Sequence, residues 1–336
     1  MIDVILAGLL IRALLGPAAA AMPPAGETPR QVHPSDEARA RRKSEVEAFV
    51  AKANKLIQGN NYDIKSTAHY KVKTDDPRFD VEAGAQMLES FRAFFDATWA
   101  GRAELLPCEE PSLIYLFYSR SSYRQLLPEE ERTIELGHVG YYRPFFDAVA
   151  IHTDTIGPAD LPDLIVHEAA HQLVQVRLYG PDAPCSLWAA EGLATYFGNT
   201  LRDTSGRFLA GSIGGKSVTL LKDAPRSGKR MGWEDATRFR RALGRDEAPT
   251  VDEILRNVDP NEFYGSSARE WYTGAWLLIH YLLHADSGVH APSLVRYLKR
   301  DAAGDGGADV LYQEIGMSRD QLDTAFRLYV GKLKAK

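Results

Sequence analysis

An apolar helix with two histidines four residues apart, predicted over residues 160–180, constrains the fold of this chain more than any other segment. Its sequence, DLPDLIVHEAAHQLVQVRLYG, begins with Asp160, a residue type favoured at helix N-caps, and stops at Gly180, which a proline follows. Residues four apart share one face of a helix, so His167 and His171 direct their imidazoles to the same place. The apolar neighbours predict that the helix is buried. Buried imidazoles need polar partners, and a metal ion would provide them.

The residue after the first histidine, Glu168, lies about 100° round the helix from His167. From there it reaches a water on a shared ion without ligating that ion. Two imidazoles leave the site incomplete, because catalytic zinc usually takes three protein ligands plus a water. A metzincin would supply a third histidine after a glycine, but Val174 and Arg177 occupy those positions. The third ligand must therefore come from elsewhere.

A glutamate on the next predicted helix, residues 186–201, can complete the site. The motif WAAEGLATYF places Glu191 twenty positions after His171. Two antiparallel helices joined by a loop can bring that carboxylate against the histidines. The spacing and the Glu-Gly-Leu-Ala-x-Tyr context resemble the gluzincins, the thermolysin-like zinc peptidases. The resemblance implies that His167, His171 and Glu191 bind one Zn²⁺ per chain and that Glu168 is the general base.

A wider resemblance covers most of the chain after residue 60. It rests on STAHYKVKTD, LIYLFYSRSSY, GYYRPFFDAVAIHTD, the histidine helix, WAAEGLATYF and a later WYTGAWLLIHYLL. This succession is similar to a group of exported bacterial gluzincin-like proteins that are mostly uncharacterised. It implies a zincin-like fold and a metal site, and says less about the substrate.

Gluzincins usually hold the developing oxyanion with a tyrosine or histidine from their helical half, and the resemblance implies such a donor here. Tyr272 is our first candidate, Tyr264 the second and His280 the third. Each of these residues can instead be core packing, as aromatic side chains in helices usually are. Asp163 and Thr195 each lie one turn from a predicted ligand, and either can orient that ligand. Thermolysin-like enzymes often have an acidic residue where Thr195 stands, so this chain departs from their pattern there.

The order of predicted elements, β-rich and then α-rich, predicts an α+β fold with the active-site helix at the junction. We expect an N-terminal lobe with a small mixed β-sheet and a mainly α-helical C-terminal lobe, as in zincins. The expected N-terminal elements are helices over 35–58 and 80–100, two short strands or one bent strand within 62–74, a buried strand over 113–118 and an edge strand pair within 140–153. The expected C-terminal elements are a surface loop over 202–230 and an all-helical remainder with capping boxes at Thr250–Glu253 and Ser318–Gln321.

The N-terminal region divides into an apolar segment and a linker. Residues 4–22 are apolar except for Arg12 and end in a run of alanines, which is typical of a signal-peptide cleavage site. We predict that residues 1–22 are a signal peptide or an N-terminal anchor, and that the protein is exported: periplasmic, secreted or membrane-anchored. Any membrane association would involve this segment alone. Residues 23–45 are proline-rich and charged and are predicted to be a linker.

The rest of the chain is predicted to divide into a zincin-like catalytic domain over residues 46–201 and a helical lobe over 202–336. The net charge of -5 and the lack of a long basic run argue against nucleic acid as a partner. Cys108 and Cys185 fit no zinc-knuckle or redox spacing. They leave two alternatives open, a single disulfide or two buried thiols.

Together these patterns predict a zinc-dependent peptidase, most simply an endopeptidase, that acts on a peptide or protein substrate. The Gly-x-Met-Glu-Asn motif of one aminopeptidase family is absent. The predicted edge strand within 140–153 can pair with an extended peptide through main-chain hydrogen bonds. Two alternatives stay open. One is a non-catalytic binding or scaffold protein that keeps the zinc fold, against which the intact Glu168 argues; the other is a zinc hydrolase of a non-peptide amide, such as a cell-wall component.

Overall fold

The computed structural model describes residues 36–59, 62–108, 110–127, 140–143, 148–180, 183–213, 216–218, 220–221, 227–229 and 231–334. The predicted signal peptide or anchor at residues 1–22 and the first part of the predicted linker lie outside these ranges. Among the helices of the described ranges, none combines the length and the apolar character needed to cross a membrane.

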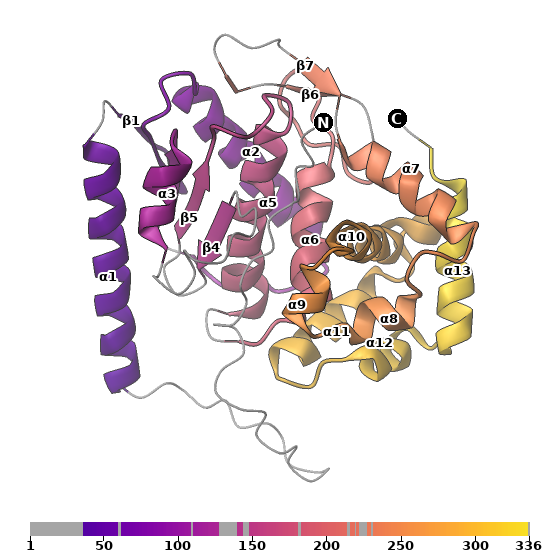
Figure 1. Ribbon diagram of the computed structural model, residues 1–336. Coiled ribbons are helices and arrows are strands. Elements are labelled where there is room, and N and C mark those ends of the chain that lie inside the picture. The colour runs from indigo at the N-terminus through magenta and orange to yellow at the C-terminus, as the bar shows by residue number, and fades with distance from the viewer. Residues whose placement is uncertain are drawn as a thin grey trace.

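A five-stranded mixed sheet with helices on both faces forms the N-terminal lobe (Figure 1). Its strands are β1 (Asp63–Ser66), β2 (Tyr70–Thr74), β3 (Ser112–Phe117), β4 (Gly140–Arg143) and β5 (Ala148–His152). The helices of this lobe are α1 (Asp36–Gln58), α2 (Val81–Trp99), α3 (Arg120–Leu126) and α5 (Leu161–Leu173).

The strand order is β1-β2-β3-β5-β4, parallel in the centre and antiparallel at both edges. The predicted α+β class with a small mixed sheet is therefore confirmed, and residues 62–74 form two strands. The predicted edge strand pair is half wrong. β5 pairs with β3 as well as with β4, so it is an inner strand. Of the two strands of the predicted pair, only β4 lies at an edge of the sheet.

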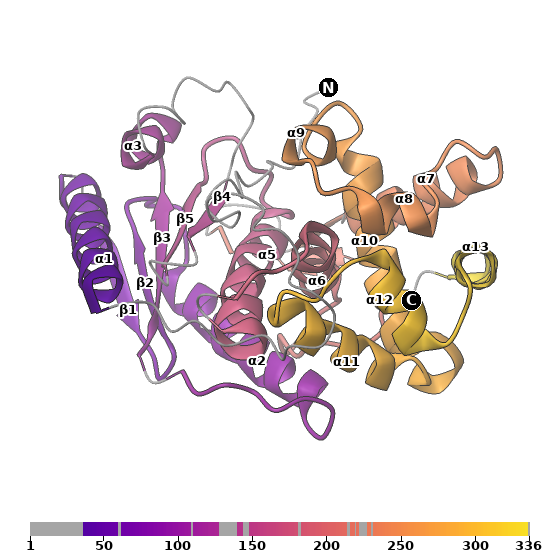
Figure 2. The same ribbon diagram turned by 90° about the horizontal axis from the view of Figure 1, so that it is seen from below.

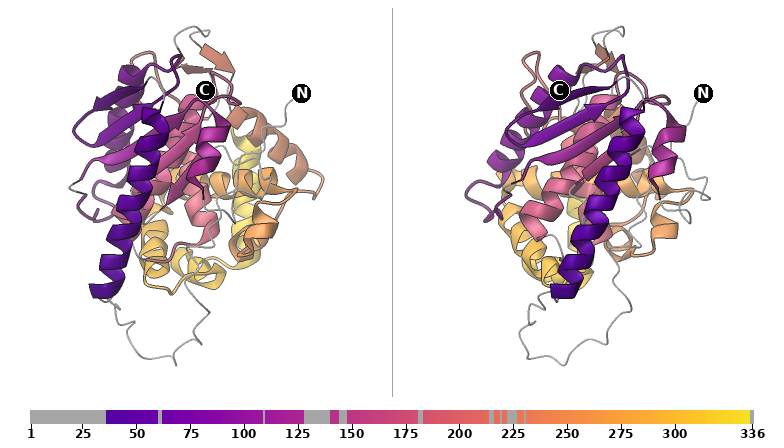
Figure 3. Two further views of the ribbon diagram at one scale, coloured as in Figure 1. Left: turned by 60° about the vertical axis from the view of Figure 1, so that its left-hand side comes forward. Right: turned by 90° about the vertical axis from the view of Figure 1, so that its left-hand side faces the viewer.

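Both faces of the sheet are buried, which explains the nearly continuous apolar run in β3. Ile114 and Leu116 face the core that includes α2 and α5, whereas Tyr115 and Phe117 face a second core with α1 and α3. This alternation follows from the two-residue period of a strand. The two helical layers on opposite sides of the sheet are visible in Figure 2 and in the turned views of Figure 3.

The C-terminal lobe is mainly helical, as predicted, and includes both predicted capping boxes. It follows helix α6 (Leu187–Asn199). Its own helices are α7 (Met231–Leu243), α8 (Val251–Arg256), α9 (Pro260–Phe263), α10 (Ala268–His284), α11 (Ala291–Ala302), α12 (Ala308–Ile315) and α13 (Arg319–Lys332), with a 3₁₀ segment η3 (Ala285–Gly288). The predicted surface loop over 202–230 is partly wrong, because it contains a two-stranded sheet of β6 (Lys216–Val218) and β7 (Ser227–Lys229).

The helix predicted over 160–180 is an α-helix that continues as a π-helix. After α5 the chain forms η2 (Val174–Tyr179), where the backbone N–H of Val174 bonds both Ala170 O and His171 O. The Gln175 side chain then donates to the carbonyls of Gly180 and Ala183 and fixes the turn that follows. The helix begins after Asp160, as predicted, but the Asp160 side chain makes no capping bond.

Helix α6 lies between the two lobes and packs against both α5 and α10 (Figure 1). Two glycines make these close approaches possible. A Cβ on Gly198 would lie 2.9 Å from Asp163 O, and one on Gly192 would lie 2.8 Å from Ala275 O. One hydrophobic cluster extends from β2 and α2 through α5 and α6 to α13. The predicted catalytic and C-terminal parts therefore share a core.

The two cysteines lie apart and form no disulfide. Cys108 lies beside Glu110 O, and Cys185 lies just before α6, where burial raises the pKa of its thiol well above 9.0. The sequence left open either a single disulfide or two thiols, and the structure has two thiols.

Candidate metal centre

His167 and His171 converge on one point at the buried centre of α5. Each residue is only 6% exposed, and the two Nε2 atoms lie 3.2 Å apart. The rings meet edge to face with centroids 4.8 Å apart. The i, i+4 spacing places both imidazoles on one face of the helix, as the sequence predicts.

Glu191 brings a carboxylate to the same point from α6. Its Oε2 lies 3.5 Å from His167 Nε2 and 3.4 Å from His171 Nε2. The residue is fully buried, and Oε2 has no hydrogen-bond partner. A buried carboxylate oxygen without a donor costs free energy unless a cation or a proton satisfies it. The structure thus confirms that the three residues predicted as ligands form one group.

The three donor atoms suit a single metal ion. A tetrahedral site with bonds of about 2.05 Å has ligand–ligand edges of about 3.3 Å. The observed separations of 3.2, 3.4 and 3.5 Å match that edge on all three sides. Two neutral imidazoles and one carboxylate are also a common donor set for a catalytic metal ion. His167, His171 and Glu191 can therefore hold a metal ion, and we call these three residues the metal group.

The second oxygen of Glu191 is fixed by a tyrosine that follows α9. Tyr264 donates a hydrogen bond of 2.8 Å to Glu191 Oε1, and this orients Oε2 towards the histidines. Burial alone would raise the pKa of Glu191. The charges of His171 and His167 outweigh burial and lower that pKa, so the carboxylate is ionised. Tyr264 was our second candidate for an oxyanion donor, but its hydroxyl contacts the predicted metal ligand Glu191.

Glu168 lies beside the metal group and is 2% exposed. Burial raises the pKa of its carboxyl group to about 7, and the charge of His167 offsets part of that rise. Its Oε2 makes no hydrogen bond, so this oxygen is available to a proton donor. Gly140 of β4 packs directly on the carboxylate, because a Cβ there would lie 2.3 Å from Glu168 Oε1. Edge strand β4 therefore fixes the position of Glu168.

Of the other two candidate oxyanion donors, the structure brings only Tyr272 to the group. Its ring centroid lies 6.2 Å from that of His167. Burial, together with the nearby carboxylates, raises the pKa of this phenol well above 10.0, so it stays a proton donor. His280 lies elsewhere in the lobe, with Nδ1 at 2.6 Å from Tyr329 Oη.

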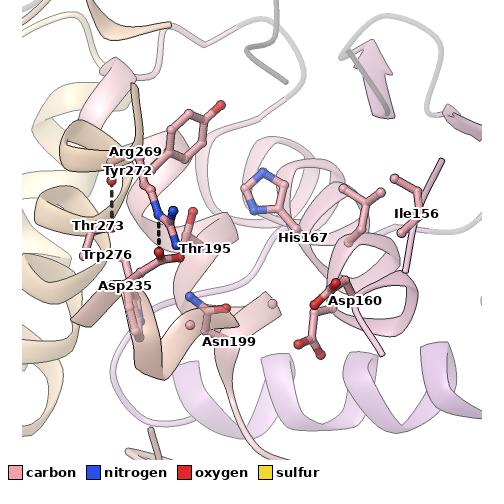
Figure 4. Close-up of a pocket in the computed structure, with 14 residues that line it drawn as sticks. Ile156, Asp160, His167, Thr195, Asn199, Asp235, Arg269, Tyr272, Thr273 and Trp276 are labelled. Atoms are coloured by element: carbon pink, nitrogen blue, oxygen red, sulfur yellow. Dashed lines mark hydrogen bonds and ion pairs between the residues drawn. The ribbon is translucent and has the colours of Figure 1, made fainter. Parts of the chain in front are cut away.

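The two residues predicted to orient a ligand have different surroundings. Asp163 pairs with Arg202 at 2.6 Å. Thr195 is 8% exposed, its hydroxyl makes no hydrogen bond, and it lines a pocket beside His167 (Figure 4). Tyr264, considered from the sequence only as an oxyanion donor, contacts the predicted ligand Glu191 directly. Neither its sequence distance from Glu191 nor its position after a four-residue helix signalled that contact.

Part of the chain matches a known protein family. Residues 163–303 match DUF1570, a family described only as a protein of unknown function. The matched range contains His167, Glu168, Glu191 and Tyr272, but not β4. No curated protein matches the chain. The part of the chain similar to this family therefore spans the metal group from α5 to α11.

Proposed function

We propose that the protein is a zinc-dependent peptidase that hydrolyses internal peptide bonds. The observation that carries the proposal is the convergence of His167 Nε2, His171 Nε2 and Glu191 Oε2, with the carboxylate of Glu168 beside them. A site with three protein ligands leaves room for a water, as catalytic zinc sites do and structural ones do not.

Zinc held by these residues would supply a Lewis acid that activates water and polarises a carbonyl group. Glu168 would take the proton from the attacking water on Oε2, the oxygen that makes no hydrogen bond. It would then return that proton to the nitrogen of the leaving amine. Gly140 supports this role, because its missing side chain lets the carboxylate lie against β4.

Tyr272 would stabilise the charge that develops on the carbonyl oxygen. Its phenol stays protonated in this environment and lies close to His167, so it can donate to an oxyanion formed there. Tyr264 has a different role, since its hydroxyl is directed at Glu191 Oε1 and orients the ligand.

The substrate backbone would bind along β4. This strand is the last in the sheet order and contacts Glu168 through Gly140. An extended peptide that pairs with the edge of β4 would lie across the metal group, where main-chain hydrogen bonds would give affinity without strong sequence preference. This geometry favours cleavage within a chain.

The test is a peptide-library digest with the purified protein and with Glu168→Gln, each after reconstitution with zinc. We expect cleavage by the wild-type protein and a loss of at least about 1000-fold in Glu168→Gln, because the variant keeps the shape of the side chain but cannot accept a proton. Zinc content measured on the same samples should be equal.

The digest also separates the alternatives. Cleavage that persists in Glu168→Gln would overturn the assignment of the base. A protein that binds zinc but cleaves no peptide in the library would favour a binding protein or a hydrolase of other amides. A useful control is Glu247→Gln, because Glu247 is an exposed carboxylate paired with Arg245 on the surface.

A further inference from the structure

A pocket opens directly beside the metal group and has no part in the chemistry proposed above. It lies among α5, α6, α7 and α10. His167 lines one side of it, so whatever fills the pocket also lies against a predicted metal ligand (Figure 4).

Arg269 presents hydrogen-bond donors to this pocket. Its Nε donates to the carboxylate of Asp235, an interaction that uses only one of its nitrogens. A guanidinium has five N–H donors in a planar fork, and the terminal pair suits a carboxylate. The Arg269 side chain is 35% exposed and lines the pocket, so these terminal donors are accessible to a ligand.

Thr195 adds a second polar group on the same side of the pocket. Thr195 is only 8% exposed, and its hydroxyl has no hydrogen-bond partner. Thr195 and Arg269 both line the pocket. A buried hydroxyl without a partner is costly, and a ligand oxygen near Arg269 would satisfy it.

Most of the remaining wall is apolar. Leu164 and Trp276 are both buried and line the pocket, and Tyr272 lies on the side of the metal group. A ligand that fits this wall therefore carries a hydrocarbon or aromatic body and a compact anionic group. Apolar walls with few polar groups are usual for sites that recognise one end of a small ligand.

Two of the three carboxylates that line the pocket are paired with arginines. Asp235 is paired with Arg269 itself, and Asp163 is paired with Arg202. Asp160 lines the opposite side, beside Ile156, away from the guanidinium in Figure 4. Arg269 and Thr195 thus each offer hydrogen-bond donors to the pocket.

We infer that this pocket binds a carboxylate of the substrate through the Arg269 guanidinium and the Thr195 hydroxyl. The apolar part of the substrate residue that carries this carboxylate lies against Leu164 and Trp276. The inference rests on the proposed function, because it assigns the pocket to the peptide that is cleaved. The carboxylate has two sources in a peptide: the C-terminus, which would make the protein a carboxypeptidase, or an acidic side chain beside the cleaved bond.

The test measures binding by calorimetry to full-length protein from which metal has been removed, so that no probe can ligate a metal ion. The probes are N-acetyl-phenylalanine, with a free C-terminal carboxylate; N-acetyl-phenylalaninamide, which has none; and N-acetyl-glutamic acid α-amide, with a side-chain carboxylate only. We expect one of the two carboxylate probes to bind at least about tenfold more tightly than the neutral amide. The tighter one identifies the source.

Variants show whether that preference arises in the pocket. The pair Arg269→Gln with Asp235→Asn removes the guanidinium without leaving Asp235 charged and unpaired, and should abolish the preference. Thr195→Val keeps the shape of the side chain and should weaken the binding of the preferred carboxylate probe about threefold or more. Arg238→Gln is the matched control. Arg238 is a neighbouring arginine on α7 that is 62% exposed and pairs with Glu270, and its loss should change nothing.

Equal binding of the amide and both carboxylates would overturn the inference, as would no binding of any probe. A preference that survives the loss of Arg269 would also overturn it. None of these outcomes depends on zinc or on cleavage, so failure here is distinct from failure of the proposed peptidase activity. With zinc restored, a C-terminal source predicts release of single residues, and a side-chain source predicts internal cleavage beside glutamate.

Discussion

The phenol of Tyr264 donates a hydrogen bond of 2.8 Å to Glu191 Oε1 across 73 residues of sequence, leaving Oε2 directed at the two histidines. Partners of this kind fix the orientation of a ligand, and their loss typically weakens metal binding by about 10–100-fold. The contact connects the segment before α10 to the metal group on α5 and α6.

Tyr264→Phe should therefore weaken zinc binding by about 10–100-fold while the protein stays folded. The measurement is the zinc Kd by competition with a chelator of known affinity. Tyr281→Phe is the control, because it removes a hydroxyl that bonds His290 in another part of the lobe. Equal zinc affinity in both variants would show that Tyr264 does not position the ligand.

Tyr272→Phe should have the opposite profile. It removes the proposed oxyanion donor, which is typically worth about 100–1000-fold in kcat. The hydrogen bond from Tyr264 to Glu191 persists in this variant, so zinc affinity should fall by less than tenfold. Steady-state kinetics at saturating zinc would separate the two effects. An unchanged kcat with a raised KM would mean that Tyr272 serves substrate binding only.

Gly140→Ala should reduce kcat/KM by about 100-fold, because its Cβ would lie 2.3 Å from Glu168 Oε1 and would displace the base. Zinc content should not change, since Gly140 contacts no ligand atom in the described structure. The control is Gly331→Ala, where a Cβ meets nothing within 4 Å. If Gly140→Ala is fully active, the placement of the Glu168 carboxylate does not depend on a glycine at residue 140.

Asp76 should make acid stability depend on one ion pair. Burial alone would raise the pKa of Asp76, but hydrogen bonds from Arg78 and Thr153 lower it below 3.8. A lowered pKa in the folded state contributes stability at pH values above about 4. That contribution is lost as the pH falls through the folded value.

Asp76→Asn should therefore lower the free energy of unfolding by about 1.5 kcal/mol or more at pH 7. The difference from wild type should shrink below pH 3, where the wild-type carboxylate also becomes protonated. Urea unfolding at the two pH values measures both effects. Asp320→Asn, at a side chain that is 96% exposed, should change little at either pH. A difference for Asp76→Asn that stays constant with pH would contradict this assignment.

Local spacing predicted that His167 and His171 lie together, and the resemblance to gluzincins added Glu191 as the third ligand. His167 and His171 are one turn apart, and any α-helix places them together. Glu191 follows on the next helix after a short loop, so its approach needs only antiparallel packing of α5 and α6. The α+β class was predictable for the same reason, because strand and helix periods are local patterns.

The contacts that sequence reasoning missed join distant segments. Gly140 lies 28 positions before Glu168 and Tyr264 lies 73 after Glu191; no short-range pattern links either pair. The pocket also depends on Arg269 and Asp235, whose pairing is visible only once α7 and α10 pack together. Likewise, the proline and the alternation within 140–153 suggested an edge strand pair, and only the sheet order shows that β5 is an inner strand.

The zinc content of the purified protein and of its ligand variants tests the central claim most directly. We predict about one zinc per chain in the wild type and in Glu168→Gln, since the base is not a ligand. Less than a tenth of that amount should remain in His171→Ala and in Glu191→Ala, provided that circular dichroism shows both to be folded. No zinc in the wild type after reconstitution, or full occupancy in both ligand variants, would contradict the assignment of His167, His171 and Glu191 as a zinc site.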